Sequence, residues 1–177
     1  YRTNAQSRIF EETLRKHAVP YRIYGGLSFY QRKEIKDVIA YFRMAVNPND
    51  EEALKRIINY PARGIGNTTL SKIVDAANNY GVSLWNVINS PLSYGLNFNK
   101  GTQTKLDSFV QLMGTFIEMA VRDNADVAGN AIVKNSGIIQ DIYQDRTPEN
   151  VSRQENVEEL LNGLQEFVTT RMEEGIT

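Results

Sequence analysis

The chain has 177 residues, of which 41% are hydrophobic and 23% charged, and its net charge at pH 7 is −1. This is the composition of an ordinary globular protein with enough apolar residues for a core. The absence of cysteine excludes disulfides and cysteine-ligated zinc, and a single histidine, His17, disfavours a histidine-based metal centre. No apolar run reaches the roughly 20 residues that a transmembrane helix needs, and no signal peptide opens the chain, so we expect a cytoplasmic protein without a membrane partner.

The N-terminal segment predicts a strand–helix–strand unit. Residues 1–3 could form a short strand, apolar residues at helical spacing follow in 9–14, and Pro20 ends that helix. The aromatic and β-branched run 21–24, closed by two glycines, is typical of a second strand. Such a unit needs neighbouring strands and covering helices to be buried, so it has the character of a piece of a larger α/β domain.

After Gly26 the pattern is almost wholly helical. Apolar residues recur at helical spacing in short segments, which turns rich in proline, glycine and asparagine separate. We therefore predict a mainly α fold, with an irregular loop at 89–101. The predicted helical segments are 35–46, 53–58, 70–77, 84–88, 106–117, 138–142 and 157–168.

The first candidate site is the turn between the second and third of these helices. Two glycines around one aliphatic residue are typical of a helix–hairpin–helix turn, in which the backbone approaches a phosphate and the next helix presents its N–H groups. The same residues also fit a glycine C-cap followed by a threonine N-cap, with no role in binding. The candidate duplex-contacting residues are Arg63, Gly64, Ile65, Gly66, Asn67, Thr68, Thr69 and Lys72.

Residues 99–106 repeat the form of this turn more weakly. Lysines and threonines again precede an amphipathic helix, which starts its apolar stripe at Leu106. Both a degenerate second hairpin directed at the same duplex and a solvated loop fit the pattern.

The second candidate site lies at the N-terminus, around Arg2 and Asn4. A strand end that turns into a helix exposes backbone amides, and these two side chains add donors suited to phosphate. Alternatively, Asn4 or Ser7 caps the following helix, and Arg8 pairs with a nearby glutamate.

Three blocks of sequence, in this order, resemble UvrD/PcrA/Rep-type superfamily 1 DNA helicases. They are residues 1–8 with 21–37, residues 57–66, and residues 152–160. The chain is similar to the stretch where domain 2A of these helicases gives way to domain 2B. The resemblance implies a partial domain 2A in residues 1–45 and the helical domain 2B in residues 46–177.

The resemblance also implies a function and a set of partners. Arg2 and Asn4 would meet single-stranded DNA, and the Gly64–Gly66 turn would contact duplex phosphates. The expected partners are DNA at a single-strand–duplex junction and the helicase domains 1A, 1B and the rest of 2A. The parent would be a bacterial ATP-dependent helicase of repair or replication, in which 2B regulates unwinding by rotating about hinges near residues 47–50 and the C-terminus.

The chain by itself is not expected to be an enzyme. It contains no Gly-x-x-x-x-Gly-Lys-Ser/Thr phosphate loop, so ATP and magnesium would be bound elsewhere in the parent, and we expect no cofactor here and no ATP hydrolysis. The near-neutral net charge leaves an alternative open, a helical protein–protein interaction module without DNA binding.

Overall fold

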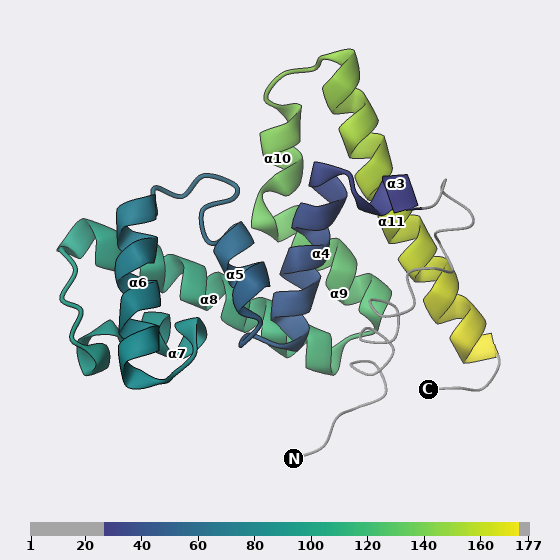
Figure 1. Ribbon diagram of the computed structural model, residues 1–177. Helices are drawn as coiled ribbons and strands as arrows, with labels where there is room; N and C mark the ends of the chain where they lie inside the picture. Colours follow the sequence, from purple (N-terminus) through teal and green to yellow (C-terminus); the bar gives the residue numbers. More distant parts are fainter. Residues whose placement is uncertain (1–26, 174–177) are drawn as a thin grey trace.

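The computed structural model describes residues 27–173, and every regular element in this range is a helix, as the apolar spacing predicts (Figure 1). Among these helices, none combines the length and the apolar character that crossing a bilayer requires. The elements are α3 (Leu27–Tyr30), α4 (Lys33–Val46), α5 (Glu51–Ile57), α6 (Asn67–Tyr80), α7 (Leu84–Asn89), the 3-10 helix η1 (Pro91–Tyr94), α8 (Lys100–Arg122), α9 (Ala125–Ser136), α10 (Ile138–Tyr143) and α11 (Pro148–Glu173).

Local residues set where several helices begin and end. Asp50 starts α5 by accepting a hydrogen bond from the Ala53 N–H at 3.1 Å, and Asn99 starts α8 by accepting one from the Thr102 N–H at 2.8 Å. Gly81 ends α6 in the left-handed conformation, with a φ of 64°. The acidic residues after Pro48 thus form a capped helix N-terminus.

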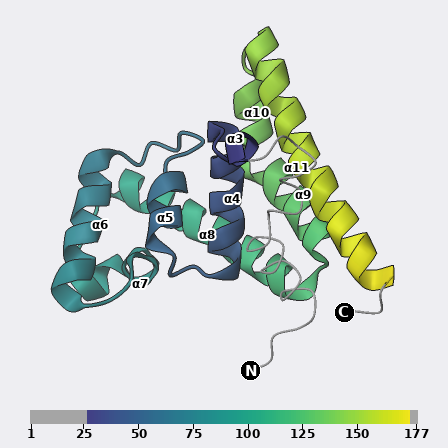
Figure 2. The same ribbon diagram turned by 45° about the vertical axis from the view of Figure 1, so that its right-hand side comes forward.

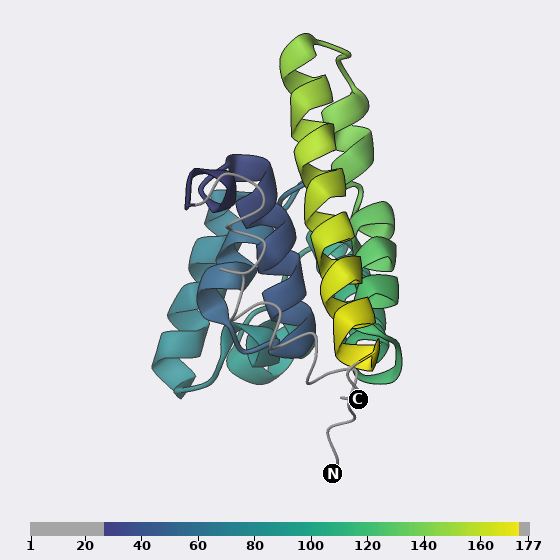
Figure 3. The same cartoon turned by 90° about the vertical axis from the view of Figure 1, so that its right-hand side faces the viewer.

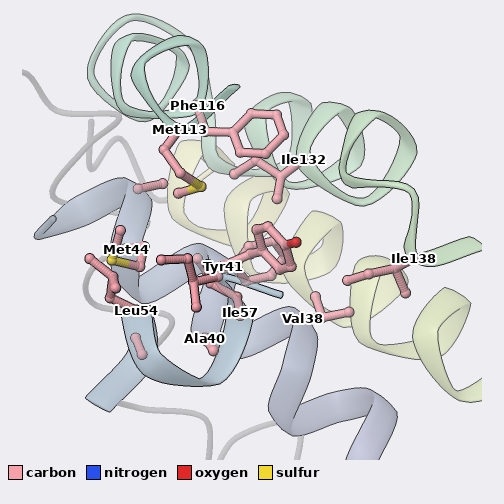
Figure 4. Close-up of a cluster of buried hydrophobic side chains, with 14 of the residues drawn as sticks. Val38, Ala40, Tyr41, Met44, Leu54, Ile57, Met113, Phe116, Ile132 and Ile138 are labelled. Atoms are coloured by element: carbon pink, nitrogen blue, oxygen red, sulfur yellow. The ribbon is translucent and has the colours of Figure 1, made fainter. Parts of the chain in front are cut away.

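The core is built around α4, which packs against α5, α8, α9 and α11. Its residues Ile35, Val38 and Tyr41 have no exposed surface. Figure 4 shows apolar side chains from α5, α8 and α9 meeting those of α4 around Tyr41. The helix therefore belongs to the same hydrophobic core as the helices that follow it.

The remaining helices lie on the two sides of α4. The helices α6 and α7 lie on one side, and α9 and α11 on the other. The long helix α8 runs from the side of α6, past α5 and α4, toward α9 (Figures 1 and 2). Figure 3 shows α11 running beside both α9 and α10, an arrangement that the many contacts between these helices support.

The strand–helix–strand unit falls in residues 1–26, outside the described residues. The turn at residues 47–50 is tied on both sides, since the Asn47 N–H donates to the Arg43 carbonyl at 2.8 Å and Arg43 forms an ion pair with Asp50 at 2.9 Å. The helix α9 has no counterpart among the predicted segments.

Candidate nucleic-acid interface

The side chain of Asn59 holds the loop between α5 and α6 in shape. Its Oδ1 accepts hydrogen bonds from the backbone N–H groups of Arg63, at 2.8 Å, and Ile65, at 3.1 Å. Ile65 is 2% exposed and anchors the turn to the core. Gly64, between them, has a φ of +81°, a conformation that favours glycine. The turn is therefore fixed, and two of its N–H groups are used inside the protein.

The guanidinium of Arg63 points into the protein rather than away from it. Its Nη2 donates to the hydroxyl of Tyr41, and its central carbon lies 5.1 Å from the centroid of the Phe109 ring. Nη1 donates to the carbonyl oxygens of Ile57 at 2.6 Å, Ile58 at 3.3 Å and Tyr60 at 3.2 Å. These three hydrogen bonds satisfy carbonyl groups at and just after the end of α5, where the helix supplies too few N–H partners. This placement differs from the anion-facing position that the sequence suggested for Arg63.

The N-terminus of α6 is open. Gly66 occupies the N-cap position with φ −85° and ψ 178°, and no side chain of the described residues caps the helix there. The first helical hydrogen bond runs from the Leu70 N–H to the Gly66 carbonyl at 3.1 Å, so the N–H groups of Asn67, Thr68 and Thr69 precede it. A Cβ atom at Gly66 would meet nothing within 4 Å. Three N–H groups and the positive end of the helix dipole are thus open to an anion.

Two exposed lysines belong to this region. Lys72 lies in the second turn of α6, and Lys105 lies near the start of α8. Neither forms an ion pair with another residue of the described range. The Nζ atom of Lys105 lies 2.8 Å from the position that a Cβ at Gly64 would occupy. The structure therefore brings the second predicted turn next to the first.

Positive charge gathers in the sequence around this turn. Between Ala53 and Leu106 there are six basic residues and one acidic residue, Asp75, which gives a net charge of +5. Because the whole chain carries −1, the remaining residues carry −6. A charge count by segment would have revealed this basic segment, residues 53–106, which the whole-chain charge conceals. Its basic residues are Lys55, Arg56, Arg63, Lys72, Lys100 and Lys105.

A polar network behind the turn connects it to α4 and α10. The Tyr41 hydroxyl donates to the Tyr60 carbonyl at 2.5 Å, and the Tyr60 hydroxyl donates to Asp141 on α10 at 3.0 Å. Burial raises the pKa of both tyrosines above the usual value, and the hydrogen bond to Asp141 raises that of Tyr60 further. Both hydroxyls therefore remain protonated donors at neutral pH.

The other predicted DNA-contacting residues, Arg2 and Asn4, lie outside the described residues, and their contact with single-stranded DNA stays a prediction. Within residues 27–173, no group of acidic or histidine side chains is placed to hold a metal ion.

The comparison with known proteins concerns the whole chain. Residues 1–177 match the family model described as the UvrD-like helicase C-terminal domain. The chain belongs to this family.

Curated relatives agree with that assignment. The chain is 35% identical over 171 residues to a protein named DNA helicase II from Salmonella typhimurium and 34% identical over 171 residues to one of the same name from Escherichia coli, in each case across 94% of the chain. It is 35% identical over 167 residues to a protein named ATP-dependent DNA helicase PcrA from Leuconostoc citreum, again across 94% of the chain. The chain spans only 23%, 23% and 22% of these relatives, in that order.

Proposed function

We propose that this chain is the part of an ATP-dependent UvrD-like DNA helicase that engages duplex DNA. A backbone phosphate of the duplex binds at the first turn of α6, where the N–H groups of Asn67, Thr68 and Thr69 are open. Gly66 lets the DNA backbone approach closely, and Lys72 adds a positive charge one turn further along the helix. The contact reads the shape and charge of the duplex and not its sequence, because phosphates carry no base information.

The observation that carries the proposal is the open N-terminus of α6 inside a basic segment. Helix N-termini without a cap leave N–H groups that need a partner, which is water or an anion. Here those groups lie in a part of the chain with a net charge of +5, in a family whose members are helicases. A negatively charged backbone is the ligand that both features favour.

In this proposal the residues of the turn have separate roles. Ile65 and Arg63 hold the turn against the core, through the buried side chain of the first and the inward hydrogen bonds of the second. Gly64 gives the turn its shape through its left-handed conformation. Gly66 and the first turn of α6 are the parts that touch DNA.

The rest of the helicase would supply the motor. ATP and magnesium bind in other domains, and Arg2 and Asn4 contact the single strand from the part of domain 2A that the chain contains. We place the start of domain 2B near α3 and not at residue 46, because α4 shares its core with α5 and α8. Rotation of 2B would then occur at the ends of this helical body, since the turn at residues 47–50 is held by hydrogen bonds.

The proposal is tested by adding a side chain at Gly66. The backbone there is extended and has free space, so Gly66→Val keeps the fold and loses at most about 1 kcal/mol of N-cap preference. Its branched side chain covers the first turn of α6 and weakens binding to a duplex–single-strand junction, measured by fluorescence anisotropy at several salt concentrations. Binding to a single-stranded oligonucleotide, assigned to Arg2 and Asn4, is unchanged.

The matched control is Ile65→Val, which shortens a side chain that is buried and does not face solvent. It costs about 0.5–1.5 kcal/mol of stability and leaves DNA binding unchanged. A thermal melt accompanies each binding curve. If Gly66→Val is folded and binds the junction as the unmodified chain does, the turn only connects two helices, and the interaction-module alternative becomes the better function.

A further inference from the structure

The side chain of Lys105 lies across the backbone of the glycine turn. Its Nζ, Cε and Cδ atoms lie 2.8, 3.0 and 3.2 Å from the position of a Cβ at Gly64. Any residue other than glycine at position 64 would therefore meet this lysine as well as adopt an unfavourable φ. The turn and the lysine side chain fit together as one surface, although they are 41 positions apart in the chain.

The helix that carries Lys105 is firmly placed. Its neighbour Leu106 has no exposed surface, and Phe109, one turn later, is 1% exposed and packs beneath the Arg63 guanidinium. The start of α8 is further fixed by the Asn99 cap. A capped and well-packed helix, and not a loop, thus places Lys105 beside the turn.

The charge of Lys105 is not used inside the described part of the chain. The acid nearest to it in sequence, Asp107, accepts a hydrogen bond from Gln103 at 2.9 Å. Lys105 forms no ion pair with any residue of the described range, and it is exposed. An unpaired cation in a segment of net charge +5 would gain favourable interactions from an anion outside the protein.

We infer that Lys105 is a further phosphate-contacting residue of the duplex interface, supplied by α8. Its ammonium meets the DNA backbone beside the glycine turn, while the first turn of α6 meets a neighbouring phosphate. The interface then has two phosphate contacts, one from α6 and one from α8, on either side of Gly64. This inference rests on the proposed function and extends it to an element that lies beyond the hairpin turn.

The test removes the charge of Lys105 and keeps its packing. Lys105→Met retains an unbranched apolar chain over Gly64, and Lys105→Arg retains the charge. Each phosphate contact that releases a counterion multiplies the binding constant by the salt concentration raised to a power of about −0.9. Lys105→Met should therefore weaken junction binding about eightfold at 0.1 M salt and reduce the magnitude of the salt slope by about 0.9. Lys105→Arg should keep both the affinity and the slope.

The matched control is Arg146→Ala, which removes one positive charge from the exposed loop between α10 and α11. It should leave the salt slope unchanged. If the net charge of the chain alone set the slope, Arg146→Ala would lower the slope as much as Lys105→Met does. An unchanged slope for Lys105→Met overturns the inference. If Gly66→Val still weakens binding in that case, the proposed function survives without Lys105. If neither variant affects binding, both the inference and the proposed function fail.

Discussion

Removing the Arg63 side chain should destabilise the fold, because its guanidinium is bound inside the protein. The change Arg63→Ala deletes donors to three carbonyl oxygens and to the Tyr41 hydroxyl. Hydrogen bonds from a charged donor contribute about 1.5–3 kcal/mol each. Ile57 and Tyr60 keep a second donor for their carbonyls, from the Tyr60 N–H and the Tyr41 hydroxyl, so the losses do not add fully. We expect a net loss of about 2–4 kcal/mol.

Urea unfolding followed by circular dichroism measures this loss, and for a chain of this size each kcal/mol also lowers Tm by about 2–4 °C. Arg63→Lys should recover less than half of the loss, because a single ammonium cannot span both the carbonyl oxygens and the Tyr41 hydroxyl. The reasoning is refuted if Arg63→Ala costs less than about 1 kcal/mol while lowering the salt slope of duplex binding. Arg63 would then contact phosphate directly, as the sequence suggested.

Two further predictions concern packing and pH. Gly129→Val should lower the free energy of unfolding in urea by about 1–3 kcal/mol, because a Cβ there would lie 2.7 Å from Leu164 Cδ2 on α11. A variant as stable as the unmodified chain would mean that α9 and α11 can move apart at no cost. Stability should fall as pH rises above about 10, since the folded state keeps Tyr41 and Tyr60 protonated when the unfolded state ionises them. Tyr60→Phe should flatten this alkaline loss, which is measured as the urea midpoint against pH, and an unchanged profile would assign the loss to other groups.

The helices with large apolar residues were predictable from sequence, and the helix with small ones was not. The stripe in residues 106–117 corresponds to buried Leu106, Phe109 and Met113 in α8. The buried face of α9 instead includes Ala125, Ala128 and Gly129, which give little apolar periodicity. Such a face packs by close approach of the backbones, and its partner on α11 lies far along the chain.

The direction of side chains around the site was beyond sequence reasoning. The hydrogen bond from Arg63 to Tyr41 joins residues 22 positions apart, and whether an arginine turns inward depends on the carbonyl groups that the end of α5 presents. The contact of Lys105 with Gly64 likewise depends on how α8 runs past α6 and α7. A charge count by segment indicates that the region is basic, but only the fold separates the cations bound inside from those left outside.

The two glycines of the turn look equivalent in sequence, but the fold requires only one of them. Gly64 needs glycine for its φ of +81°, and the Lys105 side chain lies against it. Gly66 has an extended backbone, open surroundings and the N-cap position of α6, where aspartate or serine stabilises a helix better than glycine does. Leaving this position uncapped therefore costs the fold a little stability and keeps the first-turn N–H groups available.

That argument predicts opposite effects of Gly66→Asp on folding and on binding. The new carboxylate caps α6 and complements the helix dipole, so the chain should gain a few tenths of a kcal/mol up to about 1 kcal/mol in urea unfolding. The same carboxylate occupies the N–H groups and repels phosphate, so junction binding should be lost while single-strand binding remains. A more stable variant that binds the junction unchanged would mean that the open helix end serves no anion, and a less stable one would mean that position 66 is not a free N-cap.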